Sequence, residues 1–144
     1  MKTNISEKTL QDLEFTTVLE QVSEFCISDL GRENVANIVP FTGKKQLFFE
    51  LQLVNEYLAS FENENRIPNH GFDNISEAIK RLAIENSYLE AEAYLKIASV
   101  SNTVNEQKKF LKKFKEYYPT LFELSEQIEF TTFIVDVIQK IIAP

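Results

Sequence analysis

The sequence has few residues that break helices and few that could form disulfides or bind metals. Its 144 residues include 3 glycines, 4 prolines, 1 cysteine, 1 histidine and no tryptophan. The single cysteine, Cys26, excludes a disulfide within the chain. So few glycines and prolines favour long helices over many short strands. No apolar run approaches the ~20 residues of a membrane helix, and the N-terminus lacks the apolar core of a signal peptide. We therefore expect a cytoplasmic protein with no membrane association.

The overall composition is that of a globular protein. Hydrophobic residues make up 44% and charged residues 26% of the chain, which suits one domain with its own core. The net charge of −7 disfavours tight non-specific binding to DNA, RNA or anionic membranes, because lysine and arginine drive the binding of phosphates. This net charge is an average over the chain, so it does not exclude local basic patches.

Apolar periodicity predicts two helices near the N-terminus. The first begins at Ser6. The second would be capped by Thr16 or Thr17, with Glu20 completing a capping box. Its apolar stripe has the spacing of a core-facing surface and consists of Val18, Leu19, Val22, Phe25 and Cys26. We interpret the thiol in this stripe as buried and unreactive.

The segment from Ser28 to Glu33 predicts a tight corner between two helices. Ser28 can cap a third helix that runs through Ile38, and Asp29 suits the positive end of that helix. Gly31 would let another backbone or side chain come close, at a cost of roughly 1 kcal/mol relative to alanine. A phosphate-binding loop would need more glycines and a lysine. The corner therefore indicates structure and not chemistry.

The middle of the chain predicts a long helix with a heptad-like seam. Pro40 ends the third helix, and Thr42 would cap the next one. Apolar residues of that helix alternate four and three apart, at Leu47, Leu51, Val54, Leu58 and Phe61. A polar loop with Pro68 and Gly71 follows. Asp73 or Asn74 would then cap a helix over residues 75–86.

The last third predicts another long helix, which follows a helix–turn–helix junction at NSYLEAEAY and runs to about Tyr118, where Pro119 ends it. Its expected inward residues are Ala93, Ile97, Val100, Val104, Leu111, Phe114 and Tyr118. A shorter helix should contain Leu121, Leu124 and Ile128. Residues 130–142 suit a strand or a helix, and the helical context favours a helix. The chain as a whole predicts an all-α fold, a helical bundle with one or two long helices in a single domain over residues 1–144.

The sequence contains no recognisable catalytic constellation. His70, the only histidine, lies in a turn without a second histidine or a cysteine cluster to orient it, so we interpret it as an exposed loop residue. The carboxylates fall on expected solvent faces: Glu14, Glu20, Glu24, Glu62, Glu64, Glu90 and Glu92. No glycine-rich phosphate loop, GxSxG or CxxC is present. We therefore predict no catalytic, cofactor-binding or metal-binding residue.

One basic cluster stands out in this acidic chain. It lies in the second half of the last long helix, interleaved with aromatic residues, and consists of Lys108, Lys109, Lys112, Lys113 and Lys115. Such a stripe could contact the phosphates of a nucleic acid. The alternative is a solvated face whose aliphatic stems cover core aromatics, and this alternative is favoured.

The order and the amino-acid sequences of several segments resemble the N-terminal region of the second bacterial MutS-type family, which lacks the mismatch-recognition domain. The similar residues are Leu13–Phe15, the Ser28–Glu33 corner and the helix start from Asp73 to Arg81. Longer passages also match, among them EKTLQDLEFTTVLEQVSEFCISDLGRENVANIVP, LVNEYLASF and KFLKKFKEYYPTLFELSEQI. The resemblance extends from about Ile5 to Ile142.

The resemblance implies a role within a larger protein. Members of the family are dimeric ATPases with a helical core and lever region, a P-loop ATPase domain that binds ATP and Mg²⁺, and usually a C-terminal Smr nuclease-type domain. They are associated with branched DNA, with suppression of recombination and, in some bacteria, with ribosome rescue. This chain has no GxxxxGK[ST] and no Smr segment, so no catalytic or cofactor-binding residue can be transferred to it. We expect a non-catalytic core or lever fragment whose partner is the rest of its parent chain. The alternative is a free-standing helical interaction module.

Overall fold

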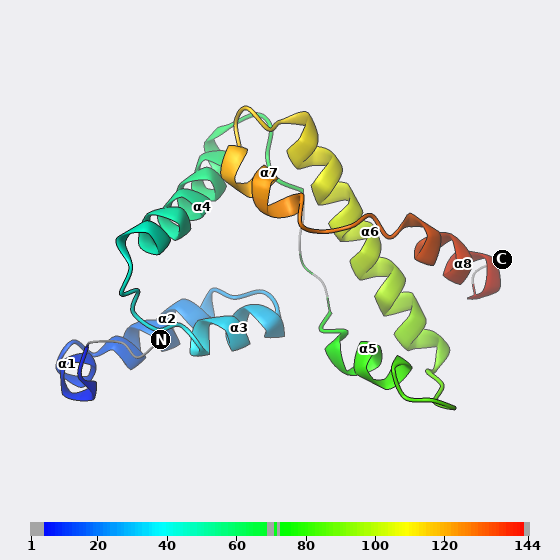
Figure 1. Ribbon diagram of the computed structural model, residues 1–144, viewed down its shortest axis with the longest axis horizontal. Helices are drawn as coiled ribbons and strands as arrows, with labels where there is room; N and C mark the ends of the chain where they lie inside the picture. Colours follow the sequence, from blue (N-terminus) through cyan, green and yellow to red (C-terminus); the bar gives the residue numbers. More distant parts are fainter. Residues whose placement is uncertain (1–4, 69–70, 72, 143–144) are drawn as a thin grey trace. The chain divides into compact units, whose positions relative to one another are not determined.

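The computed structural model describes residues 5–68, 71 and 73–142, and all its regular elements in these ranges are helices (Figure 1). The all-α class is confirmed, and the two long helices are α4 (Lys44–Glu62) and α6 (Ala91–Lys113). The chain forms two compact units, Met1–Leu51 and Gln52–Pro144. None of the helices in the described ranges combines the length and apolar character of a membrane span. The single domain over residues 1–144 stays a prediction.

The first unit contains α1 (Glu7–Asp12), α2 (Phe15–Glu24), α3 (Asp29–Ala36) and the first turns of α4. Ser6 caps α1 as expected, since its Oγ accepts a hydrogen bond from the backbone N–H of Thr9 at 3.1 Å. The predicted capping box of α2 is wrong. Glu14 is the N-cap residue, in a left-handed conformation with φ of 51° and without a side-chain cap. The tight turn after α1 therefore places both threonines inside the helix.

The predicted core-facing stripe of α2 is also largely wrong. Phe25 is 85% exposed, and Val18 and Val22 are exposed as well, while Leu19 and Cys26 are half-buried. Val35 of α3 is the one buried hydrophobic side chain among the described residues of this unit. Helix α2 packs on the short helices α1 and α3. These small neighbours cover only a narrow part of its apolar surface.

The corner between α2 and α3 is confirmed. The Oγ of Ser28 accepts a hydrogen bond from the backbone N–H of Gly31 at 3.1 Å. A Cβ atom on Gly31 would lie 3.2 Å from the Oγ of Ser28 and 3.4 Å from the Cβ of Cys26. The guanidinium of Arg32 also donates to the carbonyl of Cys26. The glycine thus permits the close approach that the sequence predicted, although α3 ends at Ala36 and not at Ile38.

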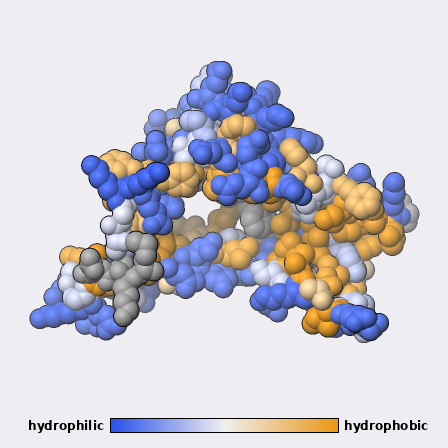
Figure 2. Space-filling model, in the orientation of Figure 1, coloured by the Kyte–Doolittle hydropathy of each residue, from blue (hydrophilic) through white to orange (hydrophobic). Residues whose placement is uncertain are grey.

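The second unit contains the rest of α4, together with α5 (Ser76–Leu82), α6, α7 (Pro119–Ser125) and α8 (Thr132–Ile142). The helical state of the tail is therefore confirmed. The core of this unit forms where Ile97 and Ala98 of α6 meet Ile138 of α8, and Ile75 and Ala78 pack against them. Other apolar residues of α8 remain exposed, and Figure 2 shows hydrophobic surface over this end of the unit.

Helix α5 is shorter than predicted. Ile75 is its N-cap residue, although the Oδ1 of Asn74 still accepts from the backbone N–H of Ser76 at 2.9 Å. The helix ends at Leu82 and not at residue 86.

Helix α6 ends at Lys113, so its predicted end at Tyr118 is wrong. The chain turns after this point and brings Tyr118 into the interior, where the side chain is fully buried. The hydroxyl of Tyr118 donates to the carbonyl of Asn65 at 2.6 Å and accepts from the amide of Asn63 at 3.3 Å. Tyr118 thereby joins the segment after α4 to the turn before α7.

The heptad seam of α4 is not the face that packs within the chain. Leu47, Leu51, Val54, Leu58 and Phe61 are all exposed. The covered face consists of Leu53, Glu56, Tyr57 and Ser60, of which Ser60 is buried. On this covered face, the carboxylate of Glu56 hydrogen-bonds to the backbone at the start of α7.

We predict that Tyr118→Phe destabilises the protein by about 1–2 kcal/mol, because removal of the hydroxyl leaves the partly buried carbonyl of Asn65 without this donor. Chemical denaturation followed by circular dichroism measures the change. Tyr117→Phe is the matched control, since Tyr117 is exposed, and it should change the free energy of unfolding by less than about 0.5 kcal/mol. Equal effects of the two substitutions would contradict the role of the hydroxyl.

Candidate functional site

The structure divides the predicted lysine cluster into one buried and four exposed members. Lys108 is only 6% exposed, whereas Lys109, Lys112, Lys113 and Lys115 are exposed. Lys109, Lys112 and Lys113 lie on the last turns of α6, and Lys115 follows the end of the helix. We call these four exposed residues the lysine surface.

Lys108 is engaged within the chain. Its ammonium donates to the carbonyl oxygen of Ser125 at 2.6 Å and to that of Ile128. It also lies 3.6 Å from the carboxylate of Glu126 and 5.2 Å from the ring centroid of Phe130. These contacts place a positive charge at the C-terminal end of α7, where the last carbonyl groups have no helical partner. Lys108 is therefore not among the lysines of the predicted cluster that could contact a ligand.

The other end of α7 is capped by a negative charge from α4. The two carboxylate oxygens of Glu56 accept from the backbone N–H groups of Thr120 and Leu121, each at 2.9 Å. The helix has seven residues, and charged side chains from two longer helices stabilise both of its ends. Opposite charges at the two ends complement the helix dipole.

A third polar contact holds the segment between α7 and α8. The Oδ1 of Asn105 accepts from the backbone N–H of Thr131 at 3.0 Å, and Asn105 is only 4% exposed. The inward face of α6 therefore includes Asn105 and Lys108 among its buried residues. The apolar pattern missed them because it assigns inward positions by hydrophobicity. Their spacing from Ile97 and Ser101, in steps of four, four and three, was the available signal.

The lysine surface is free of this network. Among its contacts in the described structure is that of the Lys113 ammonium, 5.0 Å from the ring centroid of Phe114. The ring of Phe114 in turn lies 4.8 Å from that of Phe110. A cation above a phenyl ring is compatible with a phosphate-contacting surface and with a solvated helix face.

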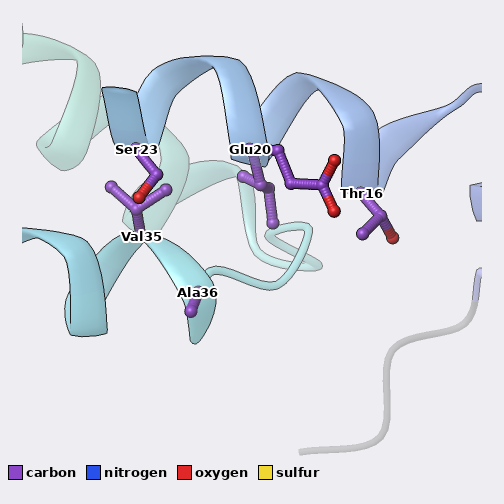
Figure 3. Close-up of a pocket in the computed structure, with 6 residues that line it drawn as sticks. Thr16, Glu20, Ser23, Val35 and Ala36 are labelled. Carbon is purple, nitrogen blue, oxygen red and sulfur yellow. The ribbon is translucent and has the colours of Figure 1, made fainter. Parts of the chain in front are cut away.

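Among the pockets of the described residues, one lies in each unit. The first, of about 240 Å³, lies between α2 and α3. Figure 3 shows Thr16, Glu20 and Ser23 on one helix facing Val35 and Ala36 on the other. The second, of about 280 Å³, lies between α6 and α7 and is lined mostly by apolar side chains. Lys108 forms part of its wall, but its ammonium already contacts backbone carbonyls.

The described residues offer no assembled metal site. No group of three or more histidine, cysteine or acidic side chains could hold an ion there. The carboxylates that were predicted to lie on solvent faces are exposed. His70 lies outside the described residues.

One exposed pair on α6 has shifted pKa values. A hydrogen bond from Lys96 and its positive charge lower the pKa of Glu92, and the same hydrogen bond together with the negative charge of Glu92 raises the pKa of Lys96. The pair lies at the start of the helix, away from the lysine surface.

The chain is similar in sequence to curated proteins named Endonuclease MutS2. It is 26% identical to the protein of Alkaliphilus oremlandii over 137 residues, which are 94% of this chain. It is 31% identical to that of Caldanaerobacter subterraneus over 150 residues, 96% of the chain, and 30% identical to that of Aquifex aeolicus over 105 residues, 73% of the chain. The resemblance to the second bacterial MutS-type family is confirmed.

The MutS2 similarity concerns a small part of each relative. The chain spans 17%, 19% and 13% of these three proteins. No family model matches the sequence, and no solved structure matches it.

We predict that Lys108→Met destabilises the protein by about 2–3 kcal/mol, because it leaves two carbonyl groups and Glu126 without their cation. Lys109→Met, the neighbouring exposed position, should change the stability by less than about 0.5 kcal/mol. Urea denaturation of both variants measures the difference. A Lys108→Met variant as stable as Lys109→Met would contradict the capping role.

Proposed function

We propose that this chain is a non-catalytic helical segment of a MutS2-type protein, acting as part of its core and lever. The observation that supports this most is the similarity to MutS2 proteins over 94–96% of the chain. A lever needs a stiff element whose neighbours move with it. Helix α6 has 23 residues, which corresponds to about 34 Å, and both α7 and α8 pack on it.

The relatives are named endonucleases, and the family resemblance adds an ATPase that uses ATP and Mg²⁺. We place neither chemistry in these 144 residues. In this proposal, the chain connects the parts of a larger MutS2-type protein, which would act as a homodimer on branched DNA or on ribosomes. Its own partner is the rest of the parent polypeptide.

The lysine surface is the proposed nucleic-acid contact of this segment. Four exposed ammonium groups lie within seven consecutive residues, 109–115, and such clusters bind phosphates by releasing counterions. A structural explanation competes with this role, since Lys112 and Lys113 lie in the last turn of α6, where cations stabilise the helix dipole. Binding measurements separate the two explanations.

We predict that the double substitution Lys109→Glu and Lys112→Glu weakens binding of the chain to a branched DNA junction by at least about tenfold. The slope of log affinity against log salt should also fall by about 2, because each lost phosphate contact removes close to one unit. Fluorescence anisotropy with labelled DNA over a range of salt concentrations measures both quantities.

The matched control reverses two exposed lysines elsewhere, Lys8→Glu and Lys140→Glu, which changes the net charge by the same amount. It should retain most of the affinity and the slope. If both double variants bind equally well, or lose binding to the same extent, the lysine surface has no specific role. The proposal of a nucleic-acid contact would then be abandoned.

A free-standing interaction module is the second candidate function. One observation favours it: the apolar seam of α4 is exposed in the structure, as the binding surface of an interaction module would be.

A further inference from the structure

The turn between α6 and α7 presents an exposed aromatic ring beside the lysine surface. Tyr117 is 59% exposed and lies in this turn, at the top of Figure 1, two residues after Lys115. Cations at the end of α6 are explained by the helix dipole alone. The dipole does not explain an aromatic ring that is open to solvent at the same place, so the ring calls for an explanation of its own.

Tyr117 and one lysine of the surface share a neighbour. The ammonium of Lys113 lies 5.0 Å from the ring centroid of Phe114, and the ring of Tyr117 lies 6.5 Å from the same centroid. All three residues belong to the second unit. A group that can bind a phosphate and a ring that can stack on a flat ligand are therefore held close to each other.

The position of Tyr117 is fixed from the protein side. Its backbone N–H donates to the carbonyl of Phe114 at 2.9 Å. Its ring lies 6.4 Å from the ring of Tyr118, which is fully buried and hydrogen-bonded to Asn65. Because these neighbours are anchored, the ring of Tyr117 would lose little freedom when a ligand stacks on it.

This combination of groups fits unpaired nucleotides better than a duplex. In a duplex each base is covered by the bases above and below it, whereas an unpaired base presents its face to an aromatic side chain. A single strand also carries a lower charge density than a duplex, which suits a chain with a net charge of −7. The exposed carboxylate of Glu116 opposes a phosphate beside Tyr117, so the neutral ring is the contact available there.

We propose that Tyr117 stacks on an unpaired base of a nucleic-acid strand whose phosphates lie on the lysine surface. This inference rests on the proposed nucleic-acid contact and specifies its ligand, a single-stranded segment. The lysines would supply most of the attraction for the backbone, and Tyr117 would supply the preference for unpaired over paired nucleotides.

The first test measures binding of the 144-residue chain to a labelled oligothymidine of about ten nucleotides and to a duplex of the same length. Tyr117→Ala should weaken binding of the single strand by at least about fivefold and that of the duplex by less than about twofold, because only the single strand loses a stacked base. Tyr117→Phe keeps the ring and should retain the affinity within about twofold. Oligouridine should respond in the same way, and the tighter of the two single strands identifies the ligand as DNA or RNA.

Tyr88→Ala is the matched control. Tyr88 is 68% exposed and has a cation beside its ring, the guanidinium of Arg81 at 5.7 Å, but it precedes the opposite end of α6. This variant should leave the affinity for oligothymidine unchanged within about twofold. Far-ultraviolet circular dichroism shows whether each variant keeps its helices. If Tyr117→Ala fails to fold, Tyr117→Leu replaces it, with the same loss of affinity expected.

The salt dependence separates stacking from the phosphate contact. Tyr117→Ala should leave the slope of log affinity against log salt unchanged, since no phosphate contact is lost, whereas Lys109→Glu/Lys112→Glu should lower it. If the lysine reversals weaken binding of the single strand and the junction but Tyr117→Ala changes neither, the nucleic-acid contact stands and the stacking is refuted. A chain that binds neither ligand overturns both.

Photo-cross-linking tests the contact directly. An oligothymidine with one 5-iodouracil base is bound to the chain and irradiated, and the cross-linked peptide is identified by mass spectrometry. We expect the cross-link at Tyr117, and its loss in Tyr117→Ala but not in Tyr88→Ala. A cross-link mainly at another tyrosine, or equal losses of affinity in the two alanine variants, would overturn the proposal.

Discussion

The ammonium of Lys108 is the contact on which the second unit depends. A helix of seven residues is too short to be stable by itself, and α7 persists because Lys108 caps its C-terminal end while Glu56 caps its N-terminal end. Both caps come from long helices, so α7 joins α4 to α6 through its own backbone. Asn105 extends the same arrangement to the segment before α8. The packing of this unit thus follows from satisfying backbone groups as much as from burying apolar area.

This polar constraint also decides which residues face solvent. Because Lys108 and Asn105 point inward, the adjacent lysines of α6 point outward and form the lysine surface. Because Glu56 points toward α7, the apolar stripe of α4 lies on an exposed face. Removing one member of such a buried arrangement leaves its partners unpaired, and the arrangement also fixes the register of the elements that it joins.

Sequence reasoning could predict the helices better than their orientation. The corner at Gly31, the helical tail and the all-α class follow from local rules of capping and composition, and the structure bears them out. The inward faces of α2 and α4 could not be predicted in the same way, because periodicity identifies an apolar face without saying what covers it. For α6, the inward face includes a lysine and an asparagine whose partners lie 17 to 26 residues away in the sequence. Apolar periodicity gives no signal for polar contacts between residues so far apart in the sequence.

The caps of α7 also bear on the lever proposal. A lever transmits a displacement only if the elements attached to it cannot slide along it. Apolar contacts between helices are non-directional and allow small shifts, whereas the hydrogen bonds of Lys108 and Asn105 hold residues 125–131 at one position on α6. A movement of that segment would therefore carry α6 with it, and the lysine surface, which lies within ten residues of both anchors, would move as well. The same buried contacts can in this way serve stability, orientation and the transfer of motion.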